Sequence, residues 1–305
     1  MSDVRTGTST SLEPEVVDDV LALVRRATDA DGVEAVSEAF RLALTSGRGG
    51  VSHTLAYAGP SPSADLLGYA ALDPSGSAEL VVDPPVRRRG VGRALLRAVL
   101  DAGATGVWAH GDLPAARALA ASEGLVPTRE LHVMERPVGE GDDVDPELPA
   151  GFSVRPFEPG RDEQAWLEVN RLAFASHPEQ GSITLEDLTE RMGQDWFDPA
   201  GFLLIEDTTA TSDGGAHPLA AFHWTKREPG SPKGEVYVVG VHPAYQGRGL
   251  AGPLTGLGTA HLARQGVATI ELYVDGDNTR ALATYRRAGF EDAAVHVVYG
   301  RPAAP

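Results

Sequence analysis

One pattern occurs twice in this chain and limits the folds that it can adopt. It consists of an apolar strand, a turn that contains glycine, and a helix rich in small residues. In the second half the strand is Glu235–Val241, the turn contains Gln246-Gly247-Arg248-Gly249-Leu250-Ala251, and the helix runs towards Arg264. β-Branched residues favour the strand, and His242-Pro243 ends it because proline has no N–H to give to a neighbouring strand. The pattern predicts a strand end, a loop and a helix start at one point.

The first half repeats this arrangement. The matching segments are Asp83-Pro84 with His242-Pro243, Arg87-x-x-Gly90-x-Gly92 with Gln246-x-x-Gly249-x-Ala251, and Glu123-Gly124-Leu125 with Ala288-Gly289-Phe290. Such agreement indicates a tandem duplication. A length of 305 residues also suits two domains. We expect a first domain over residues 1–138, an acidic linker that contains proline over 139–149, and a second domain over 150–305.

Hydrophobic periodicity predicts short strands and helices in both halves, which indicates an α/β (α+β) fold. Helices are expected over 13–26, 33–44, 94–102, 113–122, 163–174, 184–192 and 279–288. Strands are expected over 51–57, 66–72, 78–82, 106–110, 131–135, 152–156, 202–206, 219–225, 235–241, 269–273 and 295–299. We expect the polar residues 1–12 to be disordered and residues 177–181 to form a loop.

A strand, a glycine turn and a helix in this order present free backbone N–H groups at a helix N-terminus, which is an arrangement that binds phosphate. The segment is not a Walker loop, because no Gly-Lys-Ser/Thr follows, and G-x-G-x-x-G is also absent. Glycine turns before helices are common, so the hexapeptide alone is not specific.

Composition excludes several classes of function. A formal net charge of −17 repels nucleic acid, so an anionic ligand must be held by local N–H groups and a few arginines. The absence of cysteine excludes disulfides and thiolate chemistry and fits a cytoplasmic protein. No apolar run is long enough to predict a membrane span, the first residues are not those of a secretory signal, and the histidines have no metal-ligand spacing. We therefore expect a monomer without a metal, a membrane or a nucleic-acid partner.

The spacing Q-x-x-G-x-A resembles the acyl-CoA pyrophosphate loop of the GCN5-related N-acetyltransferases, or GNAT proteins. With both loops considered, residues 13–301 resemble the tandem acetyltransferases of the mycothiol synthase family. The segments that carry this resemblance are residues 174–181 (FASHPEQG), 235–241 (EVYVVGV) and 272–278 (LYVDGDN). The resemblance implies two tandem GNAT domains, each a mixed, mostly antiparallel twisted sheet flanked by helices. It also implies transfer of acetyl from acetyl-CoA to the cysteinyl amine of a small molecule, cysteinyl-glucosaminyl-inositol.

The resemblance further implies the residues that hold the donor and the acceptor. Acetyl-CoA would contact Leu80, Val81, Val82, Arg88, Arg89, Gly90, Val91, Gly92 and Arg93 in the first half. In the second half it would contact Val239, Gly240, Val241, Gln246, Gly247, Arg248, Gly249, Leu250, Ala251, Gly252, Asn278, Thr279, Arg280, Ala281, Leu282 and Ala283. The acceptor would contact Glu38, Glu179, Lys226, Glu235 and Tyr273.

Two residues of the second half would move protons. Glu235 would act as the base, and because an amine has a reference pKa of about 8 against about 4.3 for glutamate, it would work through a water or as the tetrahedral adduct forms. Tyr285 would protonate the leaving thiolate. From the residues alone, Glu235 could equally be a solvated carboxylate at a strand end, and Tyr285 could be a core aromatic of an amphipathic helix.

The first half lacks these groups. Gap-free alignment puts Gly76 opposite Glu235, Ala120 opposite Tyr285 and Leu113 opposite Asn278. We expect the first half to bind acetyl-CoA without turnover, and the alternative is a vestigial loop that serves only packing. Two other functions stay open: acetylation of another small amine or a protein N-terminus, and a non-catalytic acyl-CoA sensor.

Overall fold

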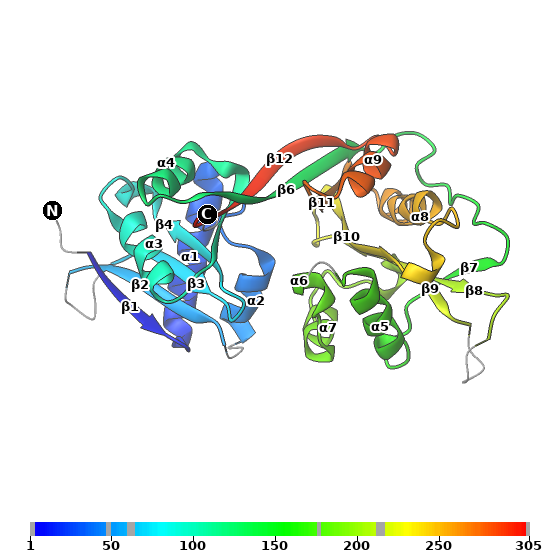
Figure 1. Cartoon of the computed structure of the whole chain (residues 1–305), viewed down its shortest axis with the longest axis horizontal. Coiled ribbons are helices and arrows are strands. Elements are labelled where there is room, and N and C mark those ends of the chain that lie inside the picture. Colours follow the sequence, from blue (N-terminus) through cyan, green and yellow to red (C-terminus); the bar gives the residue numbers. More distant parts are fainter. Residues whose placement is uncertain (1–3, 47–49, 60–64, 176–177, 212–216, 303–305) are drawn as a thin grey trace. The chain divides into compact units, whose positions relative to one another are not determined.

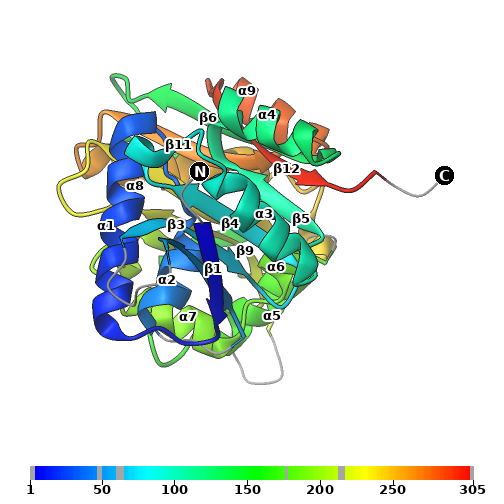
Figure 2. The same cartoon turned by 90° about the vertical axis from the view of Figure 1, so that its left-hand side faces the viewer.

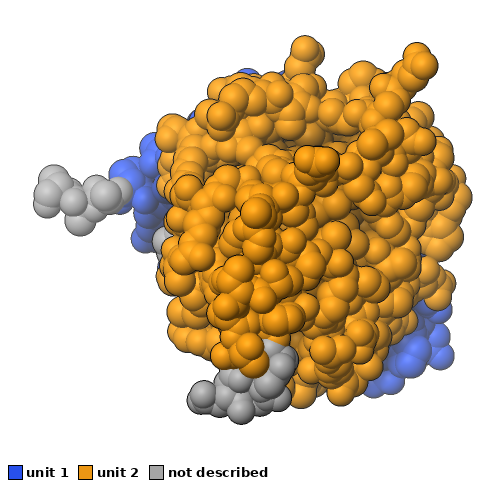
Figure 3. Space-filling view, turned by 90° about the vertical axis from the view of Figure 1, so that its right-hand side faces the viewer, with its two compact units in different colours: residues 1–131, 294–305 blue, residues 132–293 orange. Residues whose placement is uncertain are grey.

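The computed structural model of the protein describes residues 4–46, 50–59, 65–175, 178–211 and 217–302. The chain divides into two compact units, which are coloured separately in Figure 3. Unit 1 contains Met1–Leu131 and Ala294–Pro305, and unit 2 contains His132–Ala293. None of the described helices is both long and apolar enough to cross a membrane.

Unit 1 is a sheet with helices on both faces (Figures 1 and 2). Its elements are β1 (Val4–Ser9), α1 (Pro14–Asp31), α2 (Glu38–Ser46), β2 (Ser52–Ala58), β3 (Leu66–Leu72), β4 (Ser77–Val82), η1 (Pro84–Val86), α3 (Val91–Asp101), β5 (Gly106–Ala109), η2 (His110–Asp112), α4 (Pro114–Ser122), the start of β6 (Val126–Pro137) and the end of β12 (Glu291–Gly300). The strand order is β1-β2-β3-β4-β5-β12. All of these neighbours are antiparallel except β4 and β5, which are parallel.

Alternation along the strands of unit 1 creates two apolar layers. On β3, Ala70 and Leu72 pack towards α3 and α4, whereas Tyr69 and Ala71 pack towards α1 and α2. Successive side chains of a strand point to opposite faces, so each layer receives every second residue.

Residues 4–9 are a strand, so the expectation of disorder over 1–12 is wrong for this part; residues 1–3 lie outside the described residues. β1 pairs with β2 from Val4↔Ala58 to Ser9↔His53. Its side chains are mostly exposed. The strand is held by backbone hydrogen bonds to a sheet edge, which leave no apolar pattern in the sequence.

The boundaries of the units differ from the expected 138/150 division. The last strand, β12, pairs with β5 from Val297↔Ala109 to Gly300↔Gly106, and its second half therefore belongs to unit 1. Pairing of residues so far apart in the chain cannot be read from local composition.

Unit 2 repeats the same architecture (Figure 1). Its elements are the end of β6, β7 (Phe152–Pro156), α5 (Glu163–Ala173), α6 (Pro178–Gly181), α7 (Leu185–Met192), η3 (Pro199–Gly201), β8 (Phe202–Asp207), β9 (Leu219–Lys226), β10 (Lys233–Val241), η4 (Pro243–Tyr245), α8 (Ala251–Arg264), β11 (Thr269–Asp275), α9 (Thr279–Arg287) and the start of β12. The order β11-β10-β9-β8-β7 is antiparallel except for the parallel pair β10 and β11. Both units are thus mixed, mostly antiparallel sheets flanked by helices, which confirms the predicted fold class.

Two features of unit 2 differ from the expectations. The segment 139–149 is not a free connection: it lies inside unit 2, where Arg136 pairs with Asp142 at 2.6 Å and Arg264 pairs with Asp145 at 2.8 Å. Pro178–Gly181 forms the helical turn α6 instead of a loop, and His177 lies outside the described residues.

Candidate functional site

The two parallel strands of unit 2 separate partway along their length. β10 pairs with β11 from Lys233↔Thr269 to Val236↔Leu272, and this register ends there. The ladder of β10 with β9 shifts at the same point, between Val236 and Val238, so Tyr237 is the extra residue of a β-bulge. Among the described residues, Val239–Val241 therefore pair with β9 but not with β11. We call this point, defined by Val236 and Leu272, the fork.

The loop after β10 provides free donors. Gly247 and Gly249 both have φ of +80°, a backbone conformation that residues other than glycine rarely adopt. No described group accepts a hydrogen bond from the backbone N–H of Gly249, Leu250 or Ala251. These N–H groups lie at the start of α8, where the helix dipole also favours a negative charge. The loop therefore has the donors that a phosphate requires.

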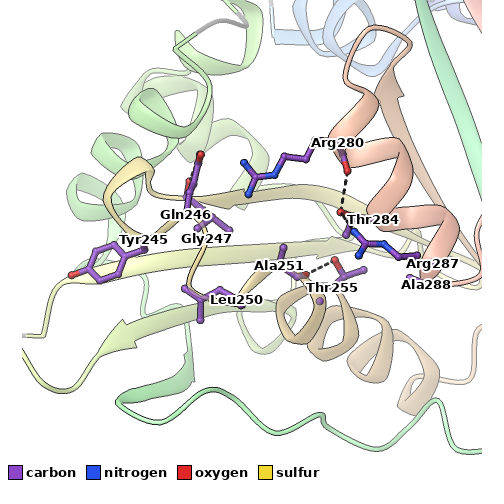
Figure 4. A pocket seen from close by; sticks show the side chains of 13 residues that line it. Tyr245, Gln246, Gly247, Leu250, Ala251, Thr255, Arg280, Thr284, Arg287 and Ala288 are labelled. Atoms are coloured by element: carbon purple, nitrogen blue, oxygen red, sulfur yellow. Dashed lines mark hydrogen bonds between the residues drawn. The ribbon is translucent and has the colours of Figure 1, made fainter.

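A pocket of ≈ 530 Å³ lies between this loop, the first turns of α8 and one face of α9 (Figure 4). Its lining includes these residues from the predicted set: Val241, Gln246, Gly247, Gly249, Leu250, Ala251, Gly252 and Arg280. It also includes residues that the sequence reasoning missed: Tyr245, Thr255, Thr284, Arg287 and Ala288. Thr284, Arg287 and Ala288 follow Arg280 at helical spacing, so the period of an α-helix could have identified them.

Other residues of the predicted set do not line this pocket. Arg248 lies over the ring of Tyr245, with its guanidinium carbon 4.7 Å from the ring centre, and is 3.9 Å from Asp207. Asn278 caps α9 by accepting a hydrogen bond from the N–H of Ala281 at 3.1 Å. The remaining members are Val239 and Gly240 on β10, Thr279, Ala281 and Ala283 on α9, and Leu282, which is buried in the core.

Tyr285 belongs to the same buried apolar cluster as Val236 and Leu272, and its ring centre lies 6.0 Å from that of Phe290. Its side chain is 9 % exposed, and burial raises the pKa of its phenol to about 12. Tyr285 is therefore a core aromatic, which is one of the two alternatives, and its role towards a thiolate stays a prediction.

Polar groups gather on the other side of the fork. In the strand registers, Glu235 lies opposite Lys226 of β9 and opposite Glu271 of β11. Lys226 is buried, and its ammonium lies 5.0 Å from the ring centre of Trp196 and 5.5 Å from that of Tyr237. Such cation–π contacts fix a charged head that burial would otherwise disfavour.

Two further contacts and one exposed side chain belong to this side of the fork. Lys226 is 3.2 Å from Glu228. Arg191 donates a hydrogen bond to the phenol oxygen of Tyr237 at 2.9 Å. Tyr273, which follows Leu272 directly, is 41 % exposed. The predicted acceptor residues Lys226, Glu235 and Tyr273 are therefore neighbours in the sheet of unit 2.

Two predicted acceptor residues are not brought into this group by the described contacts. Glu179 is in the short helix α6, and its side chain lies outside the described residues. Glu38 is the first residue of α2 in unit 1, directly after Ser37, whose N–H donates to Glu79 at 2.7 Å.

The loop of unit 1 has a similar backbone. β4 pairs with β5 only at Ser77↔Gly106 and Ala78↔Val107, so Leu80, Val81 and Val82 lie beyond the end of that ladder. Gly90, with φ of +91°, precedes α3, which contains Val91, Gly92 and Arg93.

The arginines of this loop do not all have the same environment. Arg87 forms two hydrogen bonds with Asp31, at 2.7 and 2.8 Å. Arg93 is 3.0 Å from Glu123. Arg88 and Arg89 are exposed and have no ion pair among the described residues.

The bulge changes one internal correspondence. β4 pairs with β3 without a register shift, so the extra residue Tyr237 has no counterpart in unit 1. Counted along the ladder, Glu235 corresponds to Ser77, not to Gly76 as the gap-free alignment predicts. Neither residue is an acid, so the contrast between the two units persists.

A loop with free N–H donors, a pocket beside it and a carboxylate at the fork have the chemistry to bind a nucleotide-linked acyl group and transfer it to a nucleophile. Within the described ranges, no group of three or more His, Cys, Asp or Glu could hold a metal ion. The model of the Acetyltransferase (GNAT) family matches residues 43–122 and 166–290. The chain belongs to this acetyltransferase family.

Sequence relatives assign the chain to a narrower family within the GNAT proteins. It is 50% identical to the mycothiol acetyltransferase of Kytococcus sedentarius over 294 residues, which cover 95% of this chain and 96% of that one. It is 49% identical to the mycothiol acetyltransferase of Thermobispora bispora over 292 residues, with coverages of 92% and 95%. Within the GNAT proteins, the chain is a member of the mycothiol acetyltransferase family, as the loops and the FASHPEQG segment predicted.

Solved structures agree with this fold. A GCN5-related N-acetyltransferase from Sphaerobacter thermophilus superposes with a TM-score of 0.66 at 25% identity and covers 96% of this chain and 94% of that one. A tandem GNAT protein from the clavulanic acid biosynthesis pathway, solved without AcCoA, gives a TM-score of 0.70 with 99% of both chains covered. Because its sequence is only 19% identical, the similarity to this second structure is evidence for the fold alone.

Proposed function

We propose that the protein transfers acetyl from acetyl-CoA to the cysteinyl amine of cysteinyl-glucosaminyl-inositol, producing mycothiol and CoA. The observation that carries this proposal is identity near 50% over almost the whole length with mycothiol acetyltransferases. The fork of unit 2 supports it, because Glu235 lies there and Tyr285 belongs to the same core cluster as Val236 and Leu272. We assign the donor to the pocket beside the loop and the acceptor to the side of the fork that carries Lys226 and Glu235.

The pocket fits such a donor. Gly247 has no heavy atom within 4 Å of the place where a side chain would begin, and Gly249 has one only at 3.8 Å, so an anion can approach the loop closely. The N–H groups of Gly249, Leu250 and Ala251 would hold the diphosphate, and the free edge of Val239–Val241 would pair with the pantetheine arm. When bound, acetyl-CoA supplies the activated acetyl thioester.

Glu235 would take the proton of the amine. At reference pKa values of about 8 for the amine and about 4.3 for a glutamate, direct transfer from an ammonium is uphill by ~5 kcal/mol. Glu235 therefore serves best through an intervening water, or by accepting the proton while the C–N bond forms. The buried ammonium of Lys226, opposite Glu235 in the register of β9 and β10, would add positive charge on this side of the fork.

Tyr285 would face the leaving thiolate. Because burial raises its pKa to about 12, the phenol keeps its proton at any physiological pH and can donate a hydrogen bond. Complete transfer to a thiolate with a pKa of about 8.5 would be uphill by ~5 kcal/mol. Tyr285 therefore stabilises the thiolate mainly as a hydrogen-bond donor.

Unit 1 would bind a second acetyl-CoA without turning it over. Its loop has the glycine conformation and the short parallel ladder of unit 2, but Ser77 and Ala120 stand where unit 2 has Glu235 and Tyr285. The exposed Arg88 and Arg89 add charge for the phosphates.

The test is to incubate the protein with acetyl-CoA and purified cysteinyl-glucosaminyl-inositol and to follow the acetylated product by mass. Turnover that requires both Glu235 and Tyr285 is the expected result. Turnover of a polyamine or a peptide N-terminus instead would move the proposal to another acceptor. Binding of acetyl-CoA without transfer to any amine would favour the sensor.

A further inference from the structure

One face of α9 is turned to the donor pocket. Arg280, Thr284 and Arg287 follow one another at intervals of four and three residues and all line that pocket. Leu282 and Tyr285 lie on the opposite face, in the core. Residues at this spacing share one side of a helix, so α9 is amphipathic around the pocket.

The two arginines reach different parts of the pocket. In Figure 4, the guanidinium of Arg280 extends towards Gln246 and Gly247 at the loop, whereas that of Arg287 lies beside Thr284, near the start of α8. Seven residues separate them along the chain, which corresponds to about 10 Å along the axis of an α-helix. They can therefore bind two anionic groups at different places on one ligand.

Arg287 is held for such a contact and is not neutralised. Its Nε donates to the carbonyl of Ala283 at 3.0 Å, and one terminal nitrogen donates to the hydroxyl of Thr284 at 3.3 Å. It has no ion pair among the described residues. The adjacent Arg286, in contrast, pairs with Asp292 at 2.9 Å. Arg280 likewise has no ion pair among the described residues, so two arginines without a carboxylate partner line this pocket in a chain of net charge −17.

Acetyl-CoA has phosphate in two places: the diphosphate on the 5′ side of the ribose and a phosphomonoester on the 3′ carbon. The loop N–H groups and Arg280 suit the diphosphate. The 3′-phosphate carries more than one negative charge at neutral pH, and an arginine can bind it through two N–H groups at once.

We propose that Arg287 binds the 3′-phosphate of the donor and so makes α9 the element that distinguishes CoA from 3′-dephospho-CoA. This inference rests on the proposed function to the extent that it requires the pocket to bind an acyl-CoA. It adds a residue that decides donor specificity and that lies outside the loop.

The experiment is isothermal titration calorimetry of the full chain with CoA and with 3′-dephospho-CoA, without acceptor. Arg287→Ala is compared with Arg280→Ala and with the matched control Arg286→Ala. The loop of unit 1 is the same in all of these proteins, so differences between them belong to unit 2. The wild type is expected to bind CoA about 10- to 100-fold more tightly than the dephospho form, as for a charged hydrogen bond.

In Arg287→Ala this preference should disappear, with CoA weakened and 3′-dephospho-CoA unchanged. Arg286→Ala should behave as the wild type, and Arg280→Ala should weaken both ligands and keep the preference. The assignment of Arg287 to the 3′-phosphate is overturned if Arg287→Ala still prefers CoA over 3′-dephospho-CoA, or if Arg280→Ala loses this preference. A wild type that binds both ligands equally well overturns it too. Because no acceptor is present, these outcomes do not depend on whether the cysteinyl amine is the acceptor.

Discussion

Replacing Tyr285 with phenylalanine separates the two roles that its position allows. The substitution removes one oxygen from a side chain that is 9 % exposed and leaves the packing of its ring in the core, beside Phe290, intact. If Tyr285 stabilises the thiolate, kcat should fall about 100-fold, equivalent to ~2.7 kcal/mol in the activation barrier. The KM for acetyl-CoA should change little, because the phenol contributes only when negative charge develops.

The assay is steady-state release of CoA, with the free energy of unfolding measured in urea on the same samples. The matched control is Tyr299→Phe in unit 1. Tyr299 is 8 % exposed, and its hydroxyl donates to Asp112 at 2.7 Å. This control should lose about 1–2 kcal/mol of stability and no activity. Equal losses in kcat and in acetyl-CoA affinity for Tyr285→Phe would make Tyr285 a packing residue only and would refute the reasoning.

The pH profile provides an independent check on the same side chain. If Tyr285 donates to the thiolate, its active form is the protonated phenol, and burial raises the pKa of that phenol to about 12. Loss of activity by ionisation of Tyr285 is therefore displaced upward from the reference value of about 10. The kcat of the wild type should stay level from pH 9 to about 11, and a decline centred near pH 10 that disappears in Tyr285→Phe would contradict the raised pKa.

Three more outcomes follow from particular contacts. Glu235→Gln should lower kcat/KM about 100-fold near neutral pH, and kcat/KM should recover in part above about pH 8, where the amine loses its proton without a base. A pH profile of kcat/KM that runs parallel to that of the wild type would exclude Glu235 as the base. Gly258→Ala should destabilise unit 2 in urea by about 2 kcal/mol, because its new carbon would lie 2.0 Å from the ring of the fully buried His223, and this overpacking exceeds the gain of about 1 kcal/mol in helix propensity. A stability gain would show that His223 can move. Asp162 is buried, and burial alone would raise the pKa of its carboxyl, but hydrogen bonds from Arg155 and a backbone N–H lower it. The Asp162 carboxylate therefore stabilises the fold above its unfolded pKa of about 3.9, and this stabilisation is lost as the pH falls through its lower pKa in the folded state. Asp162→Asn should lower the free energy of unfolding by about 3 kcal/mol at pH 7 and by much less at pH 2. An equal loss in the free energy of unfolding at both pH values would mean that the negative charge of Asp162 does not contribute to stability.

The sequence predicts the loops well because their chemistry is local. Glycine at positive φ, a proline that ends a strand and a helix of small residues are all adjacent in the chain. The loop at Gly249 and the strand Glu235–Val241 could therefore be predicted from a few residues. The repeat of this pattern, in turn, made the tandem architecture predictable.

Features that depend on pairing between distant residues could not be predicted in this way. The bulge at Tyr237 adds one residue to an apolar run without changing its composition, yet it shifts the internal correspondence of Glu235. β1 is mostly polar and is held mainly by backbone pairing with β2, beside a few side-chain contacts such as that of Thr8 with Thr54. Arg287 is different, since it follows Arg280 at a helical interval and needed only the period of α9 to be noticed.

The position of β12 has a consequence for how the protein is made. Its residues 297–300 pair with β5 in the sheet of unit 1, although the ribosome adds them only after the whole of unit 2. While the chain is still being synthesised, β5 lacks this neighbour and exposes an edge that could pair with other chains. Unit 1 can reach its final form only after residues 297–300 have been synthesised, so a gene fragment that ends before β12 should yield an incomplete, aggregation-prone product.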